Sequence, residues 1–363
     1  MKKTGIILSV FFMIVLQSNV FASSYDPRNY NMVSAVDDQG SNDWCLYYSM
    51  ISTIESSLIK QGFANSSINL DEHEFVASTR KHNNDLIEAL CDDGLPCDEN
   101  TGKSPKAVPL YMIEGLDMRD RKGIKKAIKE FGAVDTSFSV FEGNESYFVK
   151  DIKDGTHDSA YYSTQNDDSR EHSISIVGWD DNFSKDNFAT KPPYDGAWLV
   201  KNSWGHYYGS GYIWLSYYDA SIFQYADAVV FQKSNKKSKP FYILSFGEAY
   251  FESYYDSTKV VIADTITLAG KTYKVTQMRD GMFRGDKKLK YVKFGKYLDT
   301  IWENEFKGCT NLETVICSKN VEEIQWNAFK GCKKLKTVKV SKKCDVTGAF
   351  GKKKNSKVKF KLF

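Results

Sequence analysis

One cysteine, Cys45, stands where a polar turn passes into an apolar run. From Cys45 onward apolar residues recur every three or four positions, which predicts a helix that begins at the cysteine. The positive end of a helix favours a thiolate over a thiol. Six residues earlier, the side-chain amide of Gln39 is able to donate to an oxyanion formed beside Cys45. The predicted buried face of this helix consists of Leu46, Tyr47, Met50, Ile51, Ile54, Leu58 and Ile59.

Two later segments supply a base and an amide. Residues 171–179 alternate Ile and Ser, which predicts a strand with His172 at its start. Residues 197–205 predict an apolar strand that ends on Asn202 and is followed by Trp204. An Asn202 amide bonded to one ring nitrogen of His172 would fix the tautomer and orientation of the imidazole, and Trp204 would shield that bond from water. Together with Cys45, these residues point to nucleophilic catalysis.

At these residues the sequence resembles the papain family of cysteine peptidases. The Gln39 turn, the Cys45 helix, the His172 strand and the Asn202 run occur in the family order, and the two intervals, 172 − 45 = 127 and 202 − 45 = 157, are near those of the family. The resemblance implies an α+β fold of two lobes, one helical and one of antiparallel strands, with no cofactor and no metal. It also implies that Gln39, Cys45, His172 and Asn202 are catalytic and that Trp204 supports them.

The sequence departs from the family signature around the nucleophile. Asn42 stands where the family has its first Cys, so the disulfide commonly anchored there is absent. Trp44 precedes the nucleophile and Leu46 follows it. None of these changes removes a reacting group.

The start of the chain has the pattern of an export signal. Lys2 and Lys3 precede the apolar run 6–16, and small residues end at Ala22, which predicts cleavage before Ser23. No later stretch is long and apolar enough to predict a transmembrane anchor. We therefore expect a bacterial protein that is secreted to the outside of the cell or held at its surface, with too few residues before Cys45 for the long inhibitory propeptide of many papain relatives.

Between the site segments the sequence predicts further elements. Asp71 with Glu74 has a capping-box pattern at a helix start, the amphipathic run 124–131 predicts a helix, and residues 134–140 predict a strand. Two cysteines, Cys91 and Cys97, flank a turn-rich loop and form either one disulfide or two free thiols, because a metal site there lacks companion ligands. We interpret His73 and the acidic run 180–187 as solvated surface groups.

The composition changes after residue 231. Residues 232–240 predict a charged linker, and beyond it a Phe-x-Gly pattern recurs with a period of 23 at Phe283, Phe306 and Phe329, each followed by a β-prone segment. Such a period predicts a leucine-rich solenoid, and the residues resemble the bacterial BspA-like type. The resulting domains are a signal peptide at 1–22, a papain-like peptidase at 23–231, the linker at 232–240 and a repeat domain at 241–363.

Charge divides at the same boundary. Residues 232–363 contain 29 Lys and Arg against 13 Asp and Glu, or +16, which leaves −13 for residues 1–231 and gives the overall +3. A basic repeat domain suits an anionic cell-surface or host polymer, although Lys that serves only solubility explains it equally well. Nucleic acid is disfavoured, because the chain is exported and lacks aromatic and basic stacking motifs.

The sequence thus predicts a secreted cysteine endopeptidase that acts on proteins or peptides through a thioester on Cys45. Two alternatives stay open. One is a papain-like surface adhesin that has lost activity and binds through its repeats. The other is a cell-wall amidase or transamidase, which also uses Cys and His.

Overall fold

The computed structural model describes residues 23–140, 148–149, 151–152, 154–166, 171–207, 209–233, 241–245, 248–253, 257–268, 271–351 and 358–362. The predicted signal peptide and residues 234–240 of the predicted linker lie outside the described residues. Within the described part, no helix is long and apolar enough to cross a membrane.

The helical lobe is built around one buried helix. The predicted helix at Cys45 is confirmed as α1 (Cys45–Lys60), whose residues 48–59 are buried on every side. Side chains such as Ile51, Ile54 and Phe75 form its core. The predicted cap is also confirmed, because the Asp71 carboxylate accepts from the backbone N–H of Glu74. The other two helices of this lobe are α2 (Glu72–Lys81) and α3 (Leu86–Asp92).

The prediction that Leu46 belongs to the buried face of α1 is wrong. Its side chain is 41% exposed, whereas Ile51 and Ile54 are completely buried. The apolar period does not distinguish the two cases, because the first turn of α1 projects beyond the core at the end that carries Cys45.

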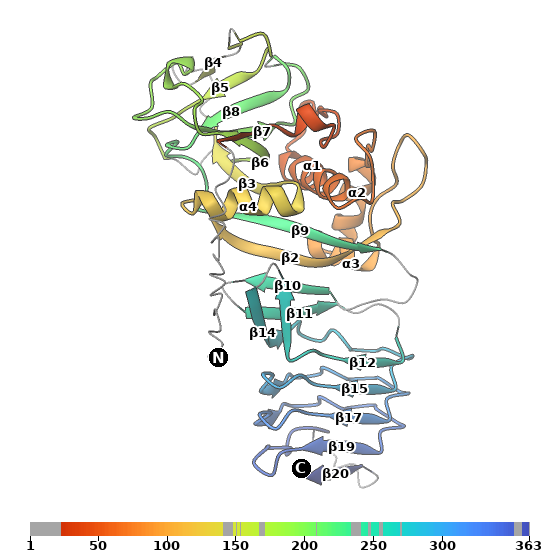
Figure 1. The fold of residues 1–363 in the computed structure, drawn as a ribbon. Helices are drawn as coiled ribbons and strands as arrows, with labels where there is room; N and C mark the ends of the chain where they lie inside the picture. The colour runs from red at the N-terminus through yellow and green to blue at the C-terminus, as the bar shows by residue number, and fades with distance from the viewer. Residues whose placement is uncertain are drawn as a thin grey trace, which may run out of the picture.

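The second lobe is a sheet whose strands run mostly antiparallel. Its order is β3, β6, β7, β8, β5 and β4, with β5 parallel to β8. The short strand β1 pairs with β6, and helix α4 packs against β6 (Figure 1). The elements are β1 (Ser24–Tyr25), η1 (Pro27–Tyr30), α4 (Arg121–Phe131), β3 (Val134–Ser139), β4 (Phe148–Val149), β5 (Ser159–Tyr161), β6 (Glu171–Asp180), η3 (Lys185–Asn187), β7 (Ala197–Lys201) and β8 (Tyr212–Ser216).

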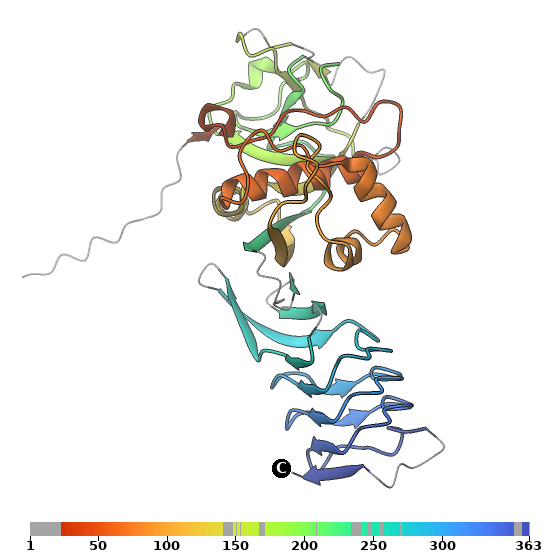
Figure 2. The ribbon, with the colours of Figure 1, turned by 90° about the vertical axis from the view of Figure 1, so that its right-hand side faces the viewer.

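The C-terminal repeats form stacked parallel rungs, seen at the lower end of Figures 1 and 2. The period of 23 is confirmed in the strand register, because Tyr291 pairs with Thr314 and Thr314 with Thr337. The repeated phenylalanines stack inside the rungs, with ring centroids 4.9 Å and 5.3 Å apart. One ladder contains β12 (Lys259–Val261), β15 (Tyr291–Lys293), β17 (Thr314–Ile316), β19 (Thr337–Val340) and β20 (Lys359–Leu362), and a second contains β16 (Thr300–Ile301) and β18 (Glu323–Ile324).

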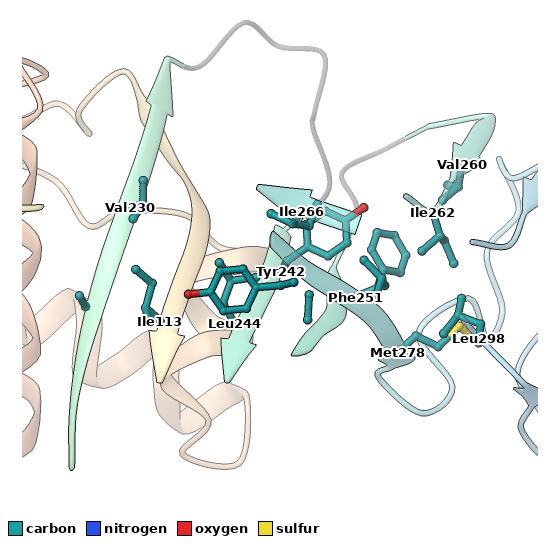
Figure 3. Close-up of a cluster of buried hydrophobic side chains, with 14 of the residues drawn as sticks. Ile113, Val230, Tyr242, Leu244, Phe251, Val260, Ile262, Ile266, Met278 and Leu298 are labelled. Carbon is teal, nitrogen blue, oxygen red and sulfur yellow. The ribbon is translucent and has the colours of Figure 1, made fainter. Parts of the chain in front are cut away.

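One sheet crosses from the helical lobe into the repeats. Strand β10, just after the predicted linker, pairs in parallel with β2, and β11, β14 and β13 extend the sheet toward the rungs. Side chains on both sides share one buried cluster, in which Ile113 and Val230 meet Tyr242 and Phe251 (Figure 3). The remaining strands are β2 (Ala107–Asp117), β9 (Tyr225–Lys233), β10 (Phe241–Ser245), β11 (Glu248–Ser253), β13 (Thr265–Leu268) and β14 (Lys271–Met278).

An ion pair spans the same junction. The guanidinium of Arg279, at the end of β14, lies 3.0 Å from the carboxylate of Glu88 on α3. The first repeat is thus tied to the helical lobe by strand pairing, apolar packing and charge.

Candidate active site

Cys45 is the first residue of α1 and has a half-exposed, free thiol. The carbonyl of Trp44 accepts the first helical hydrogen bonds, from the N–H groups of Tyr47 and Tyr48 at 3.0 Å and 3.1 Å. The earliest N–H groups of a helix have no intrahelical acceptor, so they present positive potential at the sulfur. The Trp44 ring packs in a T-shaped arrangement with the His73 ring, with ring centroids 5.1 Å apart. Position and dipole both favour a reactive cysteine.

His172 is buried at the start of β6 and bonds to Asn202. The distance from His172 Nε2 to Asn202 Oδ1 is 2.7 Å. Because an amide oxygen only accepts, Nε2 carries the proton in this arrangement and Nδ1 is left as the basic nitrogen. Trp204 stacks on the imidazole with ring centroids 4.4 Å apart. The predicted orienting and shielding contacts are both present in the geometry.

Burial sets the ionisation of this histidine. It lowers the pKa of His172 to about 4, and the bond to Asn202 opposes that shift only in part. At neutral pH the imidazole is therefore neutral unless a negative charge lies beside it. A neutral ring with a free Nδ1 is able to accept a proton.

Gln39 is fastened to the residue after Asn202. The hydroxyl of Ser203 donates to Gln39 Oε1 at 2.6 Å, and the Gln39 backbone N–H donates to the Ser203 carbonyl at 2.8 Å. These bonds fix which end of the Gln39 amide carries the N–H groups, one of which donates to the carbonyl of Asn42 at 2.7 Å. A second N–H of the same amide is available to another acceptor.

Further contacts bring the two lobes together around these residues. Asp38 forms a β-bridge with Trp204, so the loop that leads to Cys45 runs beside the loop that follows Asn202. On α1, one turn after Cys45, Ser49 donates to the buried carboxyl of Asp135 on β3. Four of the predicted residues, His172, Asn202, Trp204 and Gln39, are thus linked: the first three contact one another through His172, and Gln39 contacts Ser203, the residue after Asn202. Cys45 lies on the adjoining loop and helix.

A buried ion cluster lies beneath the site. Lys201, the residue before Asn202, has its ammonium 3.5 Å from the carboxylates of both Glu55 and Asp37 and donates to Ser34 at 2.7 Å. Burial lowers the pKa of Lys201, but attraction by Glu55 and Asp37 outweighs it and the net shift is upward. Burial also raises the pKa of Glu55, to about 6, despite the attraction of Lys201.

Sequence reasoning missed this cluster and the role of Ser203. The available signals were a lysine at the end of an otherwise apolar strand and a serine between two residues with assigned roles. Neither signal identifies the residue that is contacted, because Glu55, which pairs with Lys201, and Gln39, which bonds to Ser203, each lie more than a hundred residues away in sequence. Among the other candidates, His73 is exposed as expected, Cys97 has a free thiol, and no group of described His, Cys, Asp or Glu residues is arranged to hold a metal.

Comparison with known proteins identifies both parts of the chain. Residues 92–232, which include His172 and Asn202, match the papain family cysteine protease, and residues 245–355 match the BspA type leucine rich repeat region in six copies. The chain thus contains a region that matches the papain family, called the papain-family region below, and a region that matches BspA-type repeats. The Gln39 and Cys45 segment lies before the matched papain residues, so its assignment depends on the geometry described above.

Two individual relatives are each similar to about half of this chain. Oryzain beta chain of Oryza sativa subsp. japonica is 26% identical over 214 residues, 52% of this chain and 41% of the rice protein. Cathepsin L of Sarcophaga peregrina is 28% identical over 210 residues, 52% of this chain and 57% of the fly protein. The chain thus spans about half the length of these relatives.

A solved structure shows the same fold. It contains the cysteine protease and lectin-like domains of Cwp84, a surface layer associated protein of Clostridium difficile. The TM-score is 0.50 at 27% identity, over 60% of this chain and 54% of that chain.

Proposed function

We propose that the protein is a cysteine endopeptidase with Cys45 as nucleophile and His172 as general base and acid. The observation that carries the proposal is the 2.7 Å bond between His172 and Asn202 beneath the Trp204 ring. That bond leaves His172 Nδ1 as the basic nitrogen at a site whose adjoining loop leads to Cys45. The papain-family match to residues 92–232 adds independent support.

In this mechanism His172 Nδ1 first takes the proton of the Cys45 thiol, and the resulting thiolate sulfur then attacks the carbonyl carbon of a peptide bond. The resulting oxyanion is held by the Gln39 side-chain amide and the Cys45 backbone N–H. When the intermediate collapses, the C–N bond breaks, His172 protonates the leaving amine and a thioester remains on Cys45. Water then attacks the thioester with His172 again as base, which releases the acid and restores the thiol.

The thiol and the imidazole are expected to ionise as a pair. Because burial lowers the pKa of His172 to about 4, an imidazolium at neutral pH requires the Cys45 thiolate as its counter-charge. Asn202 stabilises that imidazolium through Nε2 and holds the ring in place. We therefore propose a thiolate paired with protonated His172 as the attacking state.

We further propose that the protein is secreted and that its basic repeats hold it on an anionic polymer. The net charge of +16 over residues 232–363 supports this partner, and residues 1–22 have the composition of an export signal. Sedimentation with an acidic polysaccharide at 0.1 M and 1 M salt tests the binding, which should weaken as the Debye length falls from about 10 Å to about 3 Å.

The peptidase proposal is tested by labelling the chain with an epoxysuccinyl inhibitor, with Cys45→Ser as control. Mass spectrometry should find one adduct, on Cys45, and casein cleavage should stop in step with labelling. If the folded protein is unlabelled and casein is intact, the proposal fails and the adhesin alternative replaces it. If casein is intact but purified peptidoglycan is digested through Cys45, the amidase alternative replaces it.

A further inference from the structure

The repeats present a lysine-bearing surface on the first ladder, the lysine sheet, defined as β12, β15, β17, β19 and β20 (Figure 1). The register places Val261, Lys293, Ile316, Lys339 and Lys361 in one column. Lys259 and Lys359 stand in the neighbouring column. These five strands contain five lysines and no acidic residue, so the sheet is uniformly positive.

A second surface has two exposed tryptophans, and we call it the tryptophan face. It consists of residues 299–304, 322–327 and 345–348 on three successive rungs around β16 and β18. Trp302 is 40% exposed and Trp326 is 45% exposed, whereas the repeated phenylalanines Phe283, Phe306 and Phe329 are completely buried. Tryptophan exposed in this way is typical of an interface anchor.

The tryptophan face also carries an excess of negative charge. Lys319 and Lys343 border it, since they line the same hollow as Asp299 and Glu322. Its three segments contain five acidic residues and no lysine or arginine. The backbone N–H of Glu322 donates to the Asp299 carbonyl and that of Asp345 to the Glu322 carbonyl, both at 2.8 Å, so these three residues occupy successive rungs. All five side chains are exposed and none forms an ion pair with a described residue, the five being Asp299, Glu303, Glu322, Glu323 and Asp345.

Like charges stacked on successive rungs destabilise a ladder. Five carboxylates, bordered by only the two lysines Lys319 and Lys343 and lying beside two exposed rings, therefore point to an external cationic partner. The same chain contains a surface of that chemistry in the lysine sheet. Because both surfaces are built on rungs with the same spacing, about 4.8 Å, charges on one copy stay in step with charges on another.

We propose that the repeats self-associate, with the tryptophan face of one copy seated on the lysine sheet of the next. The two surfaces differ, so the contact is heterologous and leaves one lysine sheet and one tryptophan face open at the ends of each assembly. Association then continues into open arrays. The proposal is independent of the peptidase chemistry, and the lysine sheet is part of the basic surface proposed above to bind an anionic polymer.

Sedimentation velocity of the whole chain tests the proposal, with Cys45→Ala present so that proteolysis does not interfere. At 0.1 M salt the average mass should rise with protein concentration above the 41.4 kDa monomer, and at 1 M salt it should return toward the monomer. Replacing Trp302 and Trp326 by Ala should raise the dissociation constant at least about tenfold.

Two charge-reversed variants make the test specific. Variant A carries Glu303→Lys, Glu322→Lys and Glu323→Lys, so the five acidic charges of its tryptophan face become −2 + 3 = +1. Variant B carries Lys293→Glu, Lys339→Glu and Lys361→Glu, so the five lysine charges of its lysine sheet become +2 − 3 = −1. Each should be monomeric alone, because both of its surfaces then have the same sign. Mixed together they should associate again in alternating order, because the lysine sheet of A meets the tryptophan face of B and the reversed tryptophan face of A meets the reversed lysine sheet of B.

The chain carrying all six reversals should self-associate again, because its two surfaces then have opposite signs once more. The proposal is overturned if the parent chain stays monomeric at every concentration at 0.1 M salt, if A and B alone still associate, or if their mixture does not. If the parent chain binds added polylysine, variant A does not, and neither self-associates, the partner of the tryptophan face is a cationic polypeptide and the proposal of a second copy is overturned.

Discussion

Replacing Lys201 by Met should strongly destabilise the papain-family region. The ammonium of Lys201 is surrounded by the oxygens of Ser34, Asp37 and Glu55, at 2.7, 3.5 and 3.5 Å. Met keeps the length of the side chain but leaves the fully buried carboxylate of Glu55 without its counter-charge. Removing one partner of a buried pair costs about 3–5 kcal/mol, and we expect the free energy of unfolding to fall by that amount at pH 8.

The pH dependence of this loss follows from Glu55. Its pKa is raised to about 6 in the folded chain, against about 4.3 when unfolded. The folded state therefore binds more protons than the unfolded state between these values, and this group makes stability fall as pH rises across the window. Without Lys201 the pKa rises further, so the cost of Lys201→Met should be larger at pH 8 than at pH 5.

Urea titrations of the parent, Lys201→Met, Glu55→Gln and the double variant measure the coupling directly. Gln keeps the shape of Glu55 and removes its charge, so the double variant should be more stable than the sum of the single losses predicts, by roughly 0.5–3 kcal/mol. A loss below about 1 kcal/mol for Lys201→Met, well under the usual cost of an orphaned buried charge, would refute the reasoning. Strict additivity of the two single changes would refute it as well.

Three further perturbations follow from the site and the core. Asn202→Ala should lower kcat/KM for casein by less than the roughly 10²–10⁴-fold that general base catalysis contributes. Cys45→Ala should abolish cleavage. Equal losses for the two variants would show that Asn202 does more than orient the base. Burial raises the pKa of Glu72 to about 8, so this group makes stability fall as pH rises from about 4.3 to 8. Replacing Glu72 by Gln should remove that contribution, measured as the change in unfolding free energy between pH 5 and pH 8.5. An unchanged difference would show that Glu72 does not titrate in this window. Phe306 stacks between two other phenylalanines, and Phe306→Ala should lower the free energy of unfolding by about 3–5 kcal/mol. Thermal unfolding should show the papain-family region destabilised together with the repeats. A lower transition temperature for the repeats alone would contradict a shared core.

Local patterns in the sequence were enough to place the main elements. The helix at Cys45, the cap at Asp71 and the rung register at Tyr291 and Thr314 each depend on residues within one turn or one repeat. Such local patterns predict the folded structure correctly because the tertiary contacts favour the same conformations. The predicted roles of His172 and Asn202 likewise rest on short motifs, one in β6 and one that continues past the end of β7.

The features that the sequence did not predict are all long-range. Leu46 fits the apolar period of α1 yet is exposed, because its surroundings are decided by where the core ends. The pairing of β10 with β2 joins strands more than a hundred residues apart, and either strand alone reads as an ordinary apolar segment. The bond from Ser203 to Gln39 depends on two loops meeting, which no local pattern describes.

The strand pairing between β2 and β10 also determines how an attached enzyme would reach its substrate. A catalytic unit on a flexible tether samples a sphere around its anchor, and its effective concentration falls as the tether lengthens. Here the backbone hydrogen bonds of one sheet continue from the papain-family region to the first repeat (Figure 3), so the anchor transmits orientation as well as position. If the repeats bind a surface, the papain-family region would therefore be held at one distance from that surface and in one orientation.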